Sequence, residues 1–285
     1  MRGFVADAFS SELFGGNQAG VILLQEGETF PAEELMCAIA GELKHSETAF
    51  VRPLTHDRLH IRYFTPAGEV DLCGHATIAS FSVLRELGLL QGGTFTLVTA
   101  AGEQTVRVED GKVFLTIRPV RRLRELTGEE CAEVLAAYGL GPEHTWPGLQ
   151  AALVNSGLTD ILLPVRDREA LMAAVQNEQA VSELSRRHDA VGVHMFCPGE
   201  GEISARCSNF APLWDIPEEC ATGTANAGLT AYLVSRGILT ANREHLIVQG
   251  EHMNRRSEIR TRSVGDDAVE VGGTAVISME LLLRC

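Results

Sequence analysis

The chain has no long apolar segment. None of its stretches approaches the roughly eighteen uninterrupted apolar residues that a membrane-spanning helix requires. The first residues, MRGFVADAFSSELF, lack the apolar run of a secretory signal peptide and show instead the alternation of a strand. We therefore expect neither a membrane span nor a secretory leader.

Basic residues are scarce. The sequence has 24 Lys and Arg against 38 Asp and Glu, which gives a formal net charge of −14. Such a surface repels a phosphate backbone, so nucleic acid is not an expected partner. It also repels an anionic substrate at long range. A carboxylate ligand must therefore be held by local backbone dipoles or by a few placed donors.

The cysteines lack the spacing of a disulfide framework or of a zinc site. There are seven, with no CxxC pair, at positions 37, 73, 131, 197, 207, 220 and 285. We expect reduced thiols in a cytoplasmic protein and no structural zinc. No GxGxxG or GxxxxGK(S/T) motif follows a strand either. The sequence therefore predicts no nucleotide, metal or organic cofactor.

The composition is that of a globular protein with room for two cores. The chain has 285 residues, of which 45% are apolar and 22% charged, and it exceeds the usual size of one compact core. We expect an N-terminal half at 1–119 and a C-terminal half at 120–285, with the chain end near 275–285 as a candidate to return to the first half. Predicted strands cover 2–9, 59–64, 94–99 and 112–117, and predicted helices cover 31–43 and 128–138, the second one capped by Thr127.

An internal repeat is the most informative feature of the sequence. Cys73-Gly74-His75-Ala76-Thr77 leads into an apolar stretch that ends near Gly88, and Thr222-Gly223-Thr224-Ala225-Asn226 leads into one that ends near Gly237. Gly223 follows Gly74 by 149 residues, and Gly237 follows Gly88 by the same 149 residues. We predict a duplicated α/β unit with two helices of like length, each begun by a Gly turn and ended by a Gly cap.

Two glycine-led helix starts point to a site for a small anion. The first turn of a helix carries unpaired N–H groups and about half a positive charge, so it binds a carboxylate without a basic side chain. Gly74 and Gly223 let the backbone approach a ligand closely, and His75 and Thr224 follow them with side chains that can form hydrogen bonds. If the two halves face each other, the two helix starts converge on one pocket.

Four motifs follow one another along most of the chain. They are Gly15-Gly16-Asn17, then Ser46-Glu47-Thr48-Ala49-Phe50-Val51, then Tyr63-Phe64-Thr65-Pro66 leading to Asp71-Leu72-Cys73-Gly74-His75-Ala76-Thr77, and finally Phe210-Ala211-Pro212 leading to Ala221-Thr222-Gly223-Thr224-Ala225. Together they resemble the phenazine-biosynthesis PhzF-like isomerases.

This resemblance implies a fold and an activity. The fold is the diaminopimelate-epimerase type of α+β fold, with two pseudo-symmetric halves, each a strand-rich, barrel-like sheet wrapped around a central helix, and an active site in the cleft between them. The activity is a cofactor-independent isomerisation that shifts a proton on a small amino-carboxylate or unsaturated carboxylate. Association as a homodimer is also implied.

The resemblance also implies roles for individual residues. The family's catalytic glutamate falls on Glu47, which would take a proton from one carbon and return it to another. From the residues alone, a Glu in HSETAF is typical of a solvated or capping carboxylate, but the apolar residues 49–51 favour partial burial and a raised pKa. The positions expected to hold the substrate or assist the proton are Asn17, Ser46, Gly74, His75, Glu219, Thr222, Gly223 and Thr224.

The sequence departs from the family pattern ahead of the second Gly turn. Where the family usually has Glu-Asp-Pro, this chain has Glu218-Glu219-Cys220. Cys220 precedes its Gly turn much as Cys73 does, although two residues out of register. In related racemases and epimerases of the fold, a cysteine at each of these places forms a thiol/thiolate pair, and a helix N-terminus lowers the pKa of a thiol. A two-cysteine racemase or epimerase, with Cys73 and Cys220 as its bases, therefore stands beside the Glu47-centred isomerase.

A third hypothesis comes from a different class. A non-catalytic ligand-binding protein could retain the same turns without chemistry. Its discriminator is the joint presence of Glu47, His75 and both thiols, which a binding protein does not need. None of the three hypotheses names the substrate.

Overall fold

The computed structural model describes residues 1–25 and 27–284, so Cys285 lies outside the described residues. The chain divides into two compact units. Unit 1 comprises Met1–Thr116 and Gly272–Cys285, and unit 2 comprises Ile117–Val271. Within the described ranges, no helix has the length and apolar character needed to cross a membrane.

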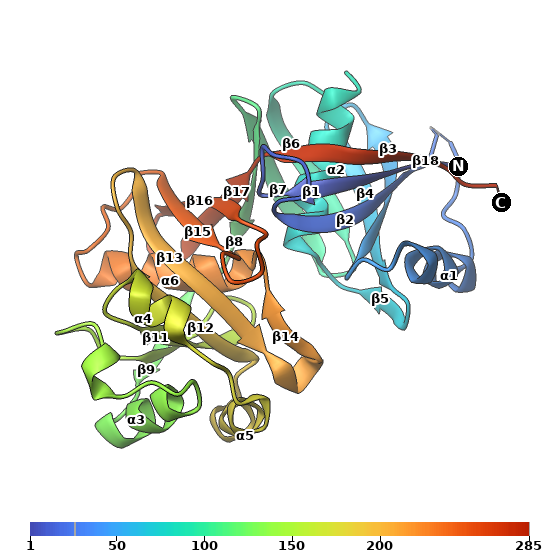
Figure 1. The fold of residues 1–285 in the computed structure, drawn as a ribbon. Coiled ribbons are helices and arrows are strands. Elements are labelled where there is room, and N and C mark those ends of the chain that lie inside the picture. Colours follow the sequence, from blue (N-terminus) through green and yellow to red (C-terminus); the bar gives the residue numbers. More distant parts are fainter. Residues whose placement is uncertain (26, 285) are drawn as a thin grey trace. The chain divides into compact units, whose positions relative to one another are not determined.

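Unit 1 consists of strands around one buried helix, α2 (Gly74–Glu86) (Figure 1). Its strands are β1 (Arg2–Ala8), β2 (Asn17–Leu23), β3 (Thr48–Thr55), β4 (Arg58–Thr65), β5 (Gly68–Val70), β6 (Gly93–Thr99), β7 (Gly102–Glu109), β8 (Lys112–Ile117) and β18 (Ala275–Leu282). Helix α2 packs against β1, β2, β3 and β18, and residues 75–84 of this helix are all buried. A helix buried on every side is the core of its unit.

The two chain ends meet in unit 1. β18 pairs antiparallel with β1, and the N-terminal amino group of Met1 donates to the carbonyl of Leu283 at 2.9 Å. Helix α1 (Glu33–Leu43) lies outside the sheet, packed against β3, β4 and β5, and joins β2 to its parallel neighbour β3. Lys44 ends this helix in the left-handed conformation, which turns the chain toward β3.

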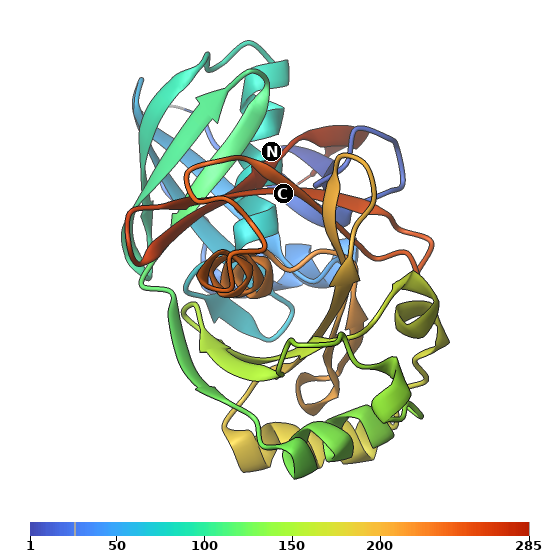
Figure 2. The same cartoon turned by 90° about the vertical axis from the view of Figure 1, so that its left-hand side faces the viewer.

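Unit 2 is built in the same way around α6 (Gly223–Ser235), which Figure 2 shows nearly end-on. Its strands are β9 (Arg121–Glu125), β10 (Ala152–Asn155), β11 (Thr159–Pro164), β12 (Gly192–Pro198), β13 (Ile203–Ala211), β14 (Ile216–Glu219), β15 (His245–Gln249), β16 (Ser257–Val264) and β17 (Ala268–Gly273). Its other helical elements are α3 (Gly128–Ala136), α4 (Arg168–Ala173), α5 (Glu178–His188) and the 3₁₀ turns η1 (Pro142–His144) and η2 (Pro212–Trp214).

The strand pairings repeat from one unit to the other. In unit 1, β2 is parallel to β3, β3 is antiparallel to β4, β4 is antiparallel to β5 and parallel to β6, and β6 is antiparallel to β7. In unit 2, β11, β12, β13, β14, β15 and β16 repeat these relations in the same order. The duplication inferred from the sequence is therefore a duplication of topology.

The two central helices also repeat residue by residue. α2 and α6 each have 13 residues and begin 149 residues apart, at Gly74 and Gly223. Gly88 and Gly237 follow their ends at φ +71° in both cases, a backbone conformation that favours glycine. The residues after them, Leu89 and Ile238, donate to carbonyls five positions back, which closes the same C-terminal motif on both helices. The predicted Gly caps are confirmed.

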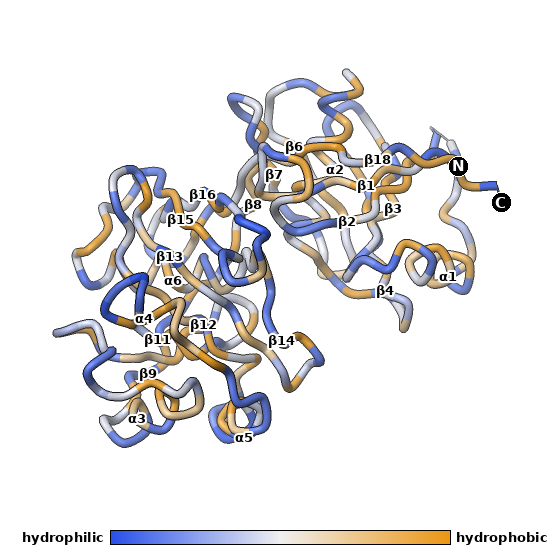
Figure 3. Tube along the Cα trace, in the orientation of Figure 1, coloured by the Kyte–Doolittle hydropathy of each residue, from blue (hydrophilic) through white to orange (hydrophobic). Residues whose placement is uncertain are grey.

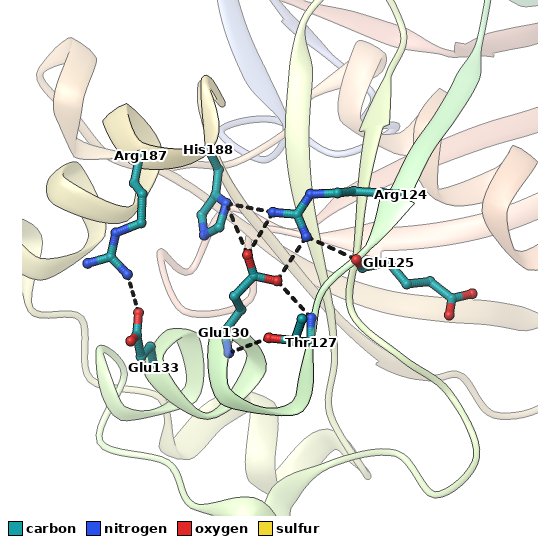
Figure 4. A network of polar contacts seen from close by, with 7 residues as sticks. All are labelled: Arg124, Glu125, Thr127, Glu130, Glu133, Arg187 and His188. Carbon is teal, nitrogen blue, oxygen red and sulfur yellow. Dashed lines mark hydrogen bonds and ion pairs between the residues drawn. The ribbon is translucent and has the colours of Figure 1, made fainter.

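The outer helices of unit 2 are amphipathic and capped by side chains. Thr127 and Glu130 form the predicted cap of α3 as a reciprocal capping box, and Arg124 holds the Glu130 carboxylate with two contacts of 2.8 Å (Figure 4). Asp167 and Asn177 cap α4 and α5 in a similar way. Figure 3 shows α5 largely in hydrophilic colours, in keeping with a helix that buries only one side.

Candidate active site

Three side chains of unit 1 meet at the N-terminus of α2. The Nε2 of His75 lies 3.3 Å from Oε2 of Glu47, and the thiol of Cys73 lies 3.7 Å from the same oxygen. Cys73 Sγ is also 3.4 Å from Nδ1 of His75. Ser46 contributes its hydroxyl, which is 3.3 Å from His75 Nε2. Four of the residues predicted from the sequence therefore form one polar cluster.

Strand and helix ends place these groups. Glu47 immediately precedes β3, and its carbonyl accepts a hydrogen bond from the N–H of Gly20 on the parallel strand β2. Cys73 is the N-cap of α2, with an extended backbone. Thr77 fixes this turn, because its hydroxyl donates to the Cys73 carbonyl at 2.7 Å and meets the hydroxyl of the buried Tyr63 at 2.6 Å. The cluster therefore stands on hydrogen-bonded secondary structure.

The cluster is partly buried, and this shapes its charge. The side chains of His75 and Glu47 are 7% and 22% exposed, so the glutamate can be reached from solvent while the imidazole is nearly covered. Burial lowers the pKa of His75; the charge of Glu47 acts in the opposite direction, and His45 adds to the lowering. The lowered pKa favours the uncharged imidazole of His75 at neutral pH.

The two central helices begin without a side-chain cap, unlike α3, α4 and α5. In α2 the first helical bond runs from Thr77 N–H to the Cys73 carbonyl, and in α6 it runs from Asn226 to Thr222. The N–H groups of residues 74–76 and 223–225 therefore lie ahead of the helical ladder, where a bound anion is stabilised.

Neither helix-leading glycine is required by the fold of its own unit. Gly74 and Gly223 do not have a positive φ. A Cβ added at Gly74 would have no described atom within 4 Å, and one added at Gly223 would make only an ordinary contact of 3.6 Å with Val271. The sequence predicts a role in turns as well as in ligand approach for both glycines. Their geometry favours close approach of a ligand.

Asn17 begins β2 in unit 1, and its side chain is buried. The remaining predicted site residues lie in unit 2, where Thr222 is the N-cap of α6. Its hydroxyl donates to Oε2 of Glu219 at 2.5 Å. The carbonyl of Thr224 accepts from Ser156 at 2.9 Å. Glu219, Thr222, Gly223 and Thr224 therefore form a second polar helix start.

Cys220 does not occupy the place of Cys73. The constant offset puts Thr222 at the N-cap that corresponds to Cys73, and Cys220 lies two residues earlier, where its carbonyl accepts from Ser257 at 2.6 Å. Burial, and after it the charge of Glu219, raises the pKa of the Cys220 thiol to about 11. A helix N-terminus would lower the pKa of a thiol. The expectation that Cys220, like Cys73, has its pKa lowered by a helix start is therefore corrected: its pKa is raised.

Several buried polar residues around α6 escaped the sequence analysis. Gln249 is fully buried on β15, where its amide accepts from Thr222 N–H at 3.2 Å and from Asn226 at 2.7 Å, and donates to the Glu219 carbonyl at 2.7 Å. It thus fixes the turn that presents Glu219. A Gln directly after the apolar run LIV in the strand HLIVQ is the signal that could have revealed it.

Asp160 is a second residue that the sequence analysis missed. In the repeated topology, the pair Thr48 and Phe64 of unit 1 corresponds to the pair Val193 and Phe210 of unit 2. The residues one position earlier, Glu47 and Gly192, therefore also correspond. Asp160 of β11 pairs with Gly192, and this residue is 4% exposed. Burial, followed by the charge of Glu219, raises its pKa to about 7. A lone Asp in the strand TDILLP was the available signal.

The described cavity of unit 1 lies away from this chemistry. It has a volume of about 850 Å³ and is lined by residues of several elements, among them Leu84 of α2, Leu90 after that helix and Phe95 of β6. None of the predicted site residues lines it. The polar cluster, and not the cavity, is therefore the candidate site.

Two units of repeated topology, each with strands around a buried helix that begins in a polar cluster, define a diaminopimelate-epimerase-like fold, as the sequence analysis expects. The chain belongs to the phenazine biosynthesis-like protein family, whose model matches residues 6–281.

Known proteins agree with this assignment. The chain is 35% identical to an uncharacterized isomerase of Deinococcus radiodurans, over 96% of this chain and 91% of that protein. A Bacillus anthracis protein of the PhzF family has the same fold, with a TM-score of 0.86 at 24% identity, covering 100% of this chain and 99% of the other. A probable proline racemase from Agrobacterium radiobacter shares the fold at a TM-score of 0.62 and 15% identity, covering 99% and 92% of the two chains. By its family and its relatives, the chain is thus an isomerase.

Proposed function

We propose that the protein is a cofactor-independent isomerase that shifts a proton on a small amino-carboxylate or unsaturated carboxylate, with Glu47 as the group that carries the proton. The contact of Glu47 with His75 and Cys73 at the N-terminus of α2 is the observation on which this proposal rests. General acid–base catalysis needs a titratable group within reach of solvent or substrate on a fixed support, and Glu47 meets both conditions.

The proton path needs one carboxyl group only. As a carboxylate, Glu47 accepts a proton from one carbon of the substrate, and the electron pair of the broken C–H bond is delocalised into the neighbouring unsaturated system. The same carboxyl then returns the proton to a second carbon, so that atoms and charges balance. His75, 3.3 Å away, fixes the orientation of the Glu47 oxygen while remaining uncharged.

The substrate carboxylate has a natural binding place at a helix start. Because the net charge of the chain is −14, the proposed attraction comes from the N–H groups ahead of the helical ladder and from the helix dipole. Gly74, beside Glu47 and without a side chain, leaves room for this approach at the reacting end. The hydroxyls of Ser46, Thr222 and Thr224 and the carboxylate of Glu219 are the proposed polar contacts to other substrate groups.

Glu47→Gln tests the proposal. Proton transfer by a positioned side chain contributes about 10²-fold to 10⁴-fold to rate, so the variant should lose at least about 10²-fold of its activity. The measurement is NMR in deuterated water over a panel of amino acids and unsaturated amino-carboxylates, which reports the carbon that exchanges and whether its configuration inverts. Glu42→Gln, an exposed glutamate on α1, is the matched control and should leave the rate unchanged.

A two-cysteine racemase is the second candidate, and the contact of Cys73 with Glu47 and His75 favours keeping it. The Cys73→Ser/Cys220→Ser double variant separates the two mechanisms. Under the Glu47 mechanism this variant retains most of its turnover. Under a two-thiol mechanism the variant loses its turnover, and the unaltered enzyme inverts the configuration of an α-carbon. An active Glu47→Gln variant together with an inactive double variant would replace the first proposal by the second.

A further inference from the structure

The ligand atoms of Glu47, Cys73 and His75 are spaced as the corners of a metal site. They lie within 4.8 Å of one another. His75 Nε2 lies 3.3 Å from Glu47 Oε2 and 3.8 Å from Cys73 Sγ. The distance between Cys73 Sγ and Glu47 Oε2 is 3.7 Å. Bond lengths of about 2.0 to 2.3 Å in a tetrahedron place such atoms about 3.3 to 3.6 Å apart. The described side chains therefore need to move by only a few tenths of an ångström.

We propose that these three side chains form a binding site for a thiophilic divalent cation, Zn²⁺ in the first place, and that the bound ion inhibits the enzyme. The inhibitory consequence rests on the proposed function, whereas the binding does not. One thiolate, one imidazole and one carboxylate form a donor set that suits Zn²⁺ and disfavours Mg²⁺ and Ca²⁺. Binding forms the sulfur–zinc bond and releases the thiol proton to solvent.

The surroundings of the cluster support binding. Cys73 sits at the N-cap of a 13-residue helix, where the positive end of the dipole stabilises a thiolate. The side chain of Glu47 is 22% exposed, and Ser46, whose hydroxyl lies 3.3 Å from His75 Nε2, is an exposed residue, so water can reach the cluster through these two side chains. Three protein ligands with an open fourth position are the usual arrangement of accessible zinc sites.

The bound ion would block proton transfer for a simple reason. It coordinates Oε2 of Glu47 and draws negative charge from the whole carboxylate, so the remaining lone pairs become much weaker bases toward a proton on carbon. In this role Zn²⁺ is a reversible inhibitor, and removal of the ion by a chelator restores the rate. Zn²⁺ is therefore not the cofactor of the reaction in this proposal.

Cobalt titration of the full-length, metal-free protein tests the site. One equivalent of Co²⁺ should produce a thiolate-to-cobalt charge-transfer band and tetrahedral visible bands, and Zn²⁺ should displace it with the same stoichiometry. Cys73→Ser should abolish the charge-transfer band, and His75→Asn should weaken binding by roughly tenfold or more. Cys131→Ser, a partly buried free thiol of unit 2, is the control and should bind like the unaltered chain.

The unaltered protein supplies a readout that does not depend on the folding of a variant. X-ray absorption of its zinc complex should show one sulfur at about 2.3 Å and lighter ligands at about 2.0 Å. Absence of binding, a shell without sulfur, or a band that persists in Cys73→Ser overturns the site. Loss of activity on chelation that Zn²⁺ then restores overturns the inhibitory role. If the protein shows the cobalt spectrum but catalyses no deuterium exchange with any substrate, the proposed function is wrong and the metal site is supported.

Discussion

Asp160 shows how burial sets the charge of a single residue. Burial, followed by the charge of Glu219, raises its pKa from 3.8 to about 7. Because the folded-state pKa is the higher one, the stability that the protonated form contributes is complete below pH ~3.8 and is lost as the pH rises through about 7. A shift of about three units corresponds to about 4 kcal/mol as an upper value.

Asp160→Asn should therefore raise the free energy of unfolding above pH ~8 and change it little below pH ~4. The amide has the shape of the carboxyl group but no charge to bury. Urea unfolding at the two pH values measures the difference. Asp189→Asn, at an exposed position that tolerates Asn, is the control and should show no such pH dependence. An equal effect of Asp160→Asn at both pH values would contradict the raised pKa.

At the scale of the element, a substitution at the start of α2 should affect turnover without lowering stability. Gly74 is the first residue of its helix, without a positive φ and with open space at its Cβ position. Gly74→Ala should leave the unfolding free energy unchanged or raise it by up to about 1 kcal/mol, because Ala costs less conformational entropy. The added methyl group meets the approaching substrate instead, and turnover should fall by about tenfold or more. Thermal unfolding and deuterium exchange on the same preparation measure both effects.

Gly128→Ala provides the matched control at the start of α3. Gly128 also begins its helix with open space at the Cβ position. This substitution should be neutral for stability and for turnover. If Gly74→Ala instead unfolds the protein, or leaves turnover at the level of Gly128→Ala, then ligand approach does not explain the glycine.

At the scale of the whole molecule, the last strand belongs to the unit that contains the first. β18 pairs with β1 along residues 275–282. A chain ending at Gly273 should expose β1 and lose hydrogen-exchange protection in unit 1, while β11 to β13 of unit 2 keep theirs. A chain ending at Leu282, which retains β18, is the control. Uniform loss of protection in both units of the shorter chain would show that they do not unfold separately.

The sequence by itself determined the duplicated helices, their lengths and their Gly caps. These features depend on residues close together in the chain, at Gly74 and Gly88 and again at Gly223 and Gly237, where backbone conformation and helix periodicity are local properties. The motif around Glu47 was also identifiable, through its resemblance to a family. The predicted strands and the two predicted helices were found for the same local reason.

Only the tertiary structure decided which groups touch. Glu47 precedes β3 while Cys73 and His75 begin α2, and pattern reading cannot bring a glutamate and a thiol 26 residues apart to within 3.7 Å. The sequence predicted no metal site because its cysteines lack local spacing, whereas the fold assembles three donors from two segments. The fold also buried Asp160 and Gln249, which the sequence pattern did not single out. Such contacts arise from long-range strand pairing, which local sequence does not encode.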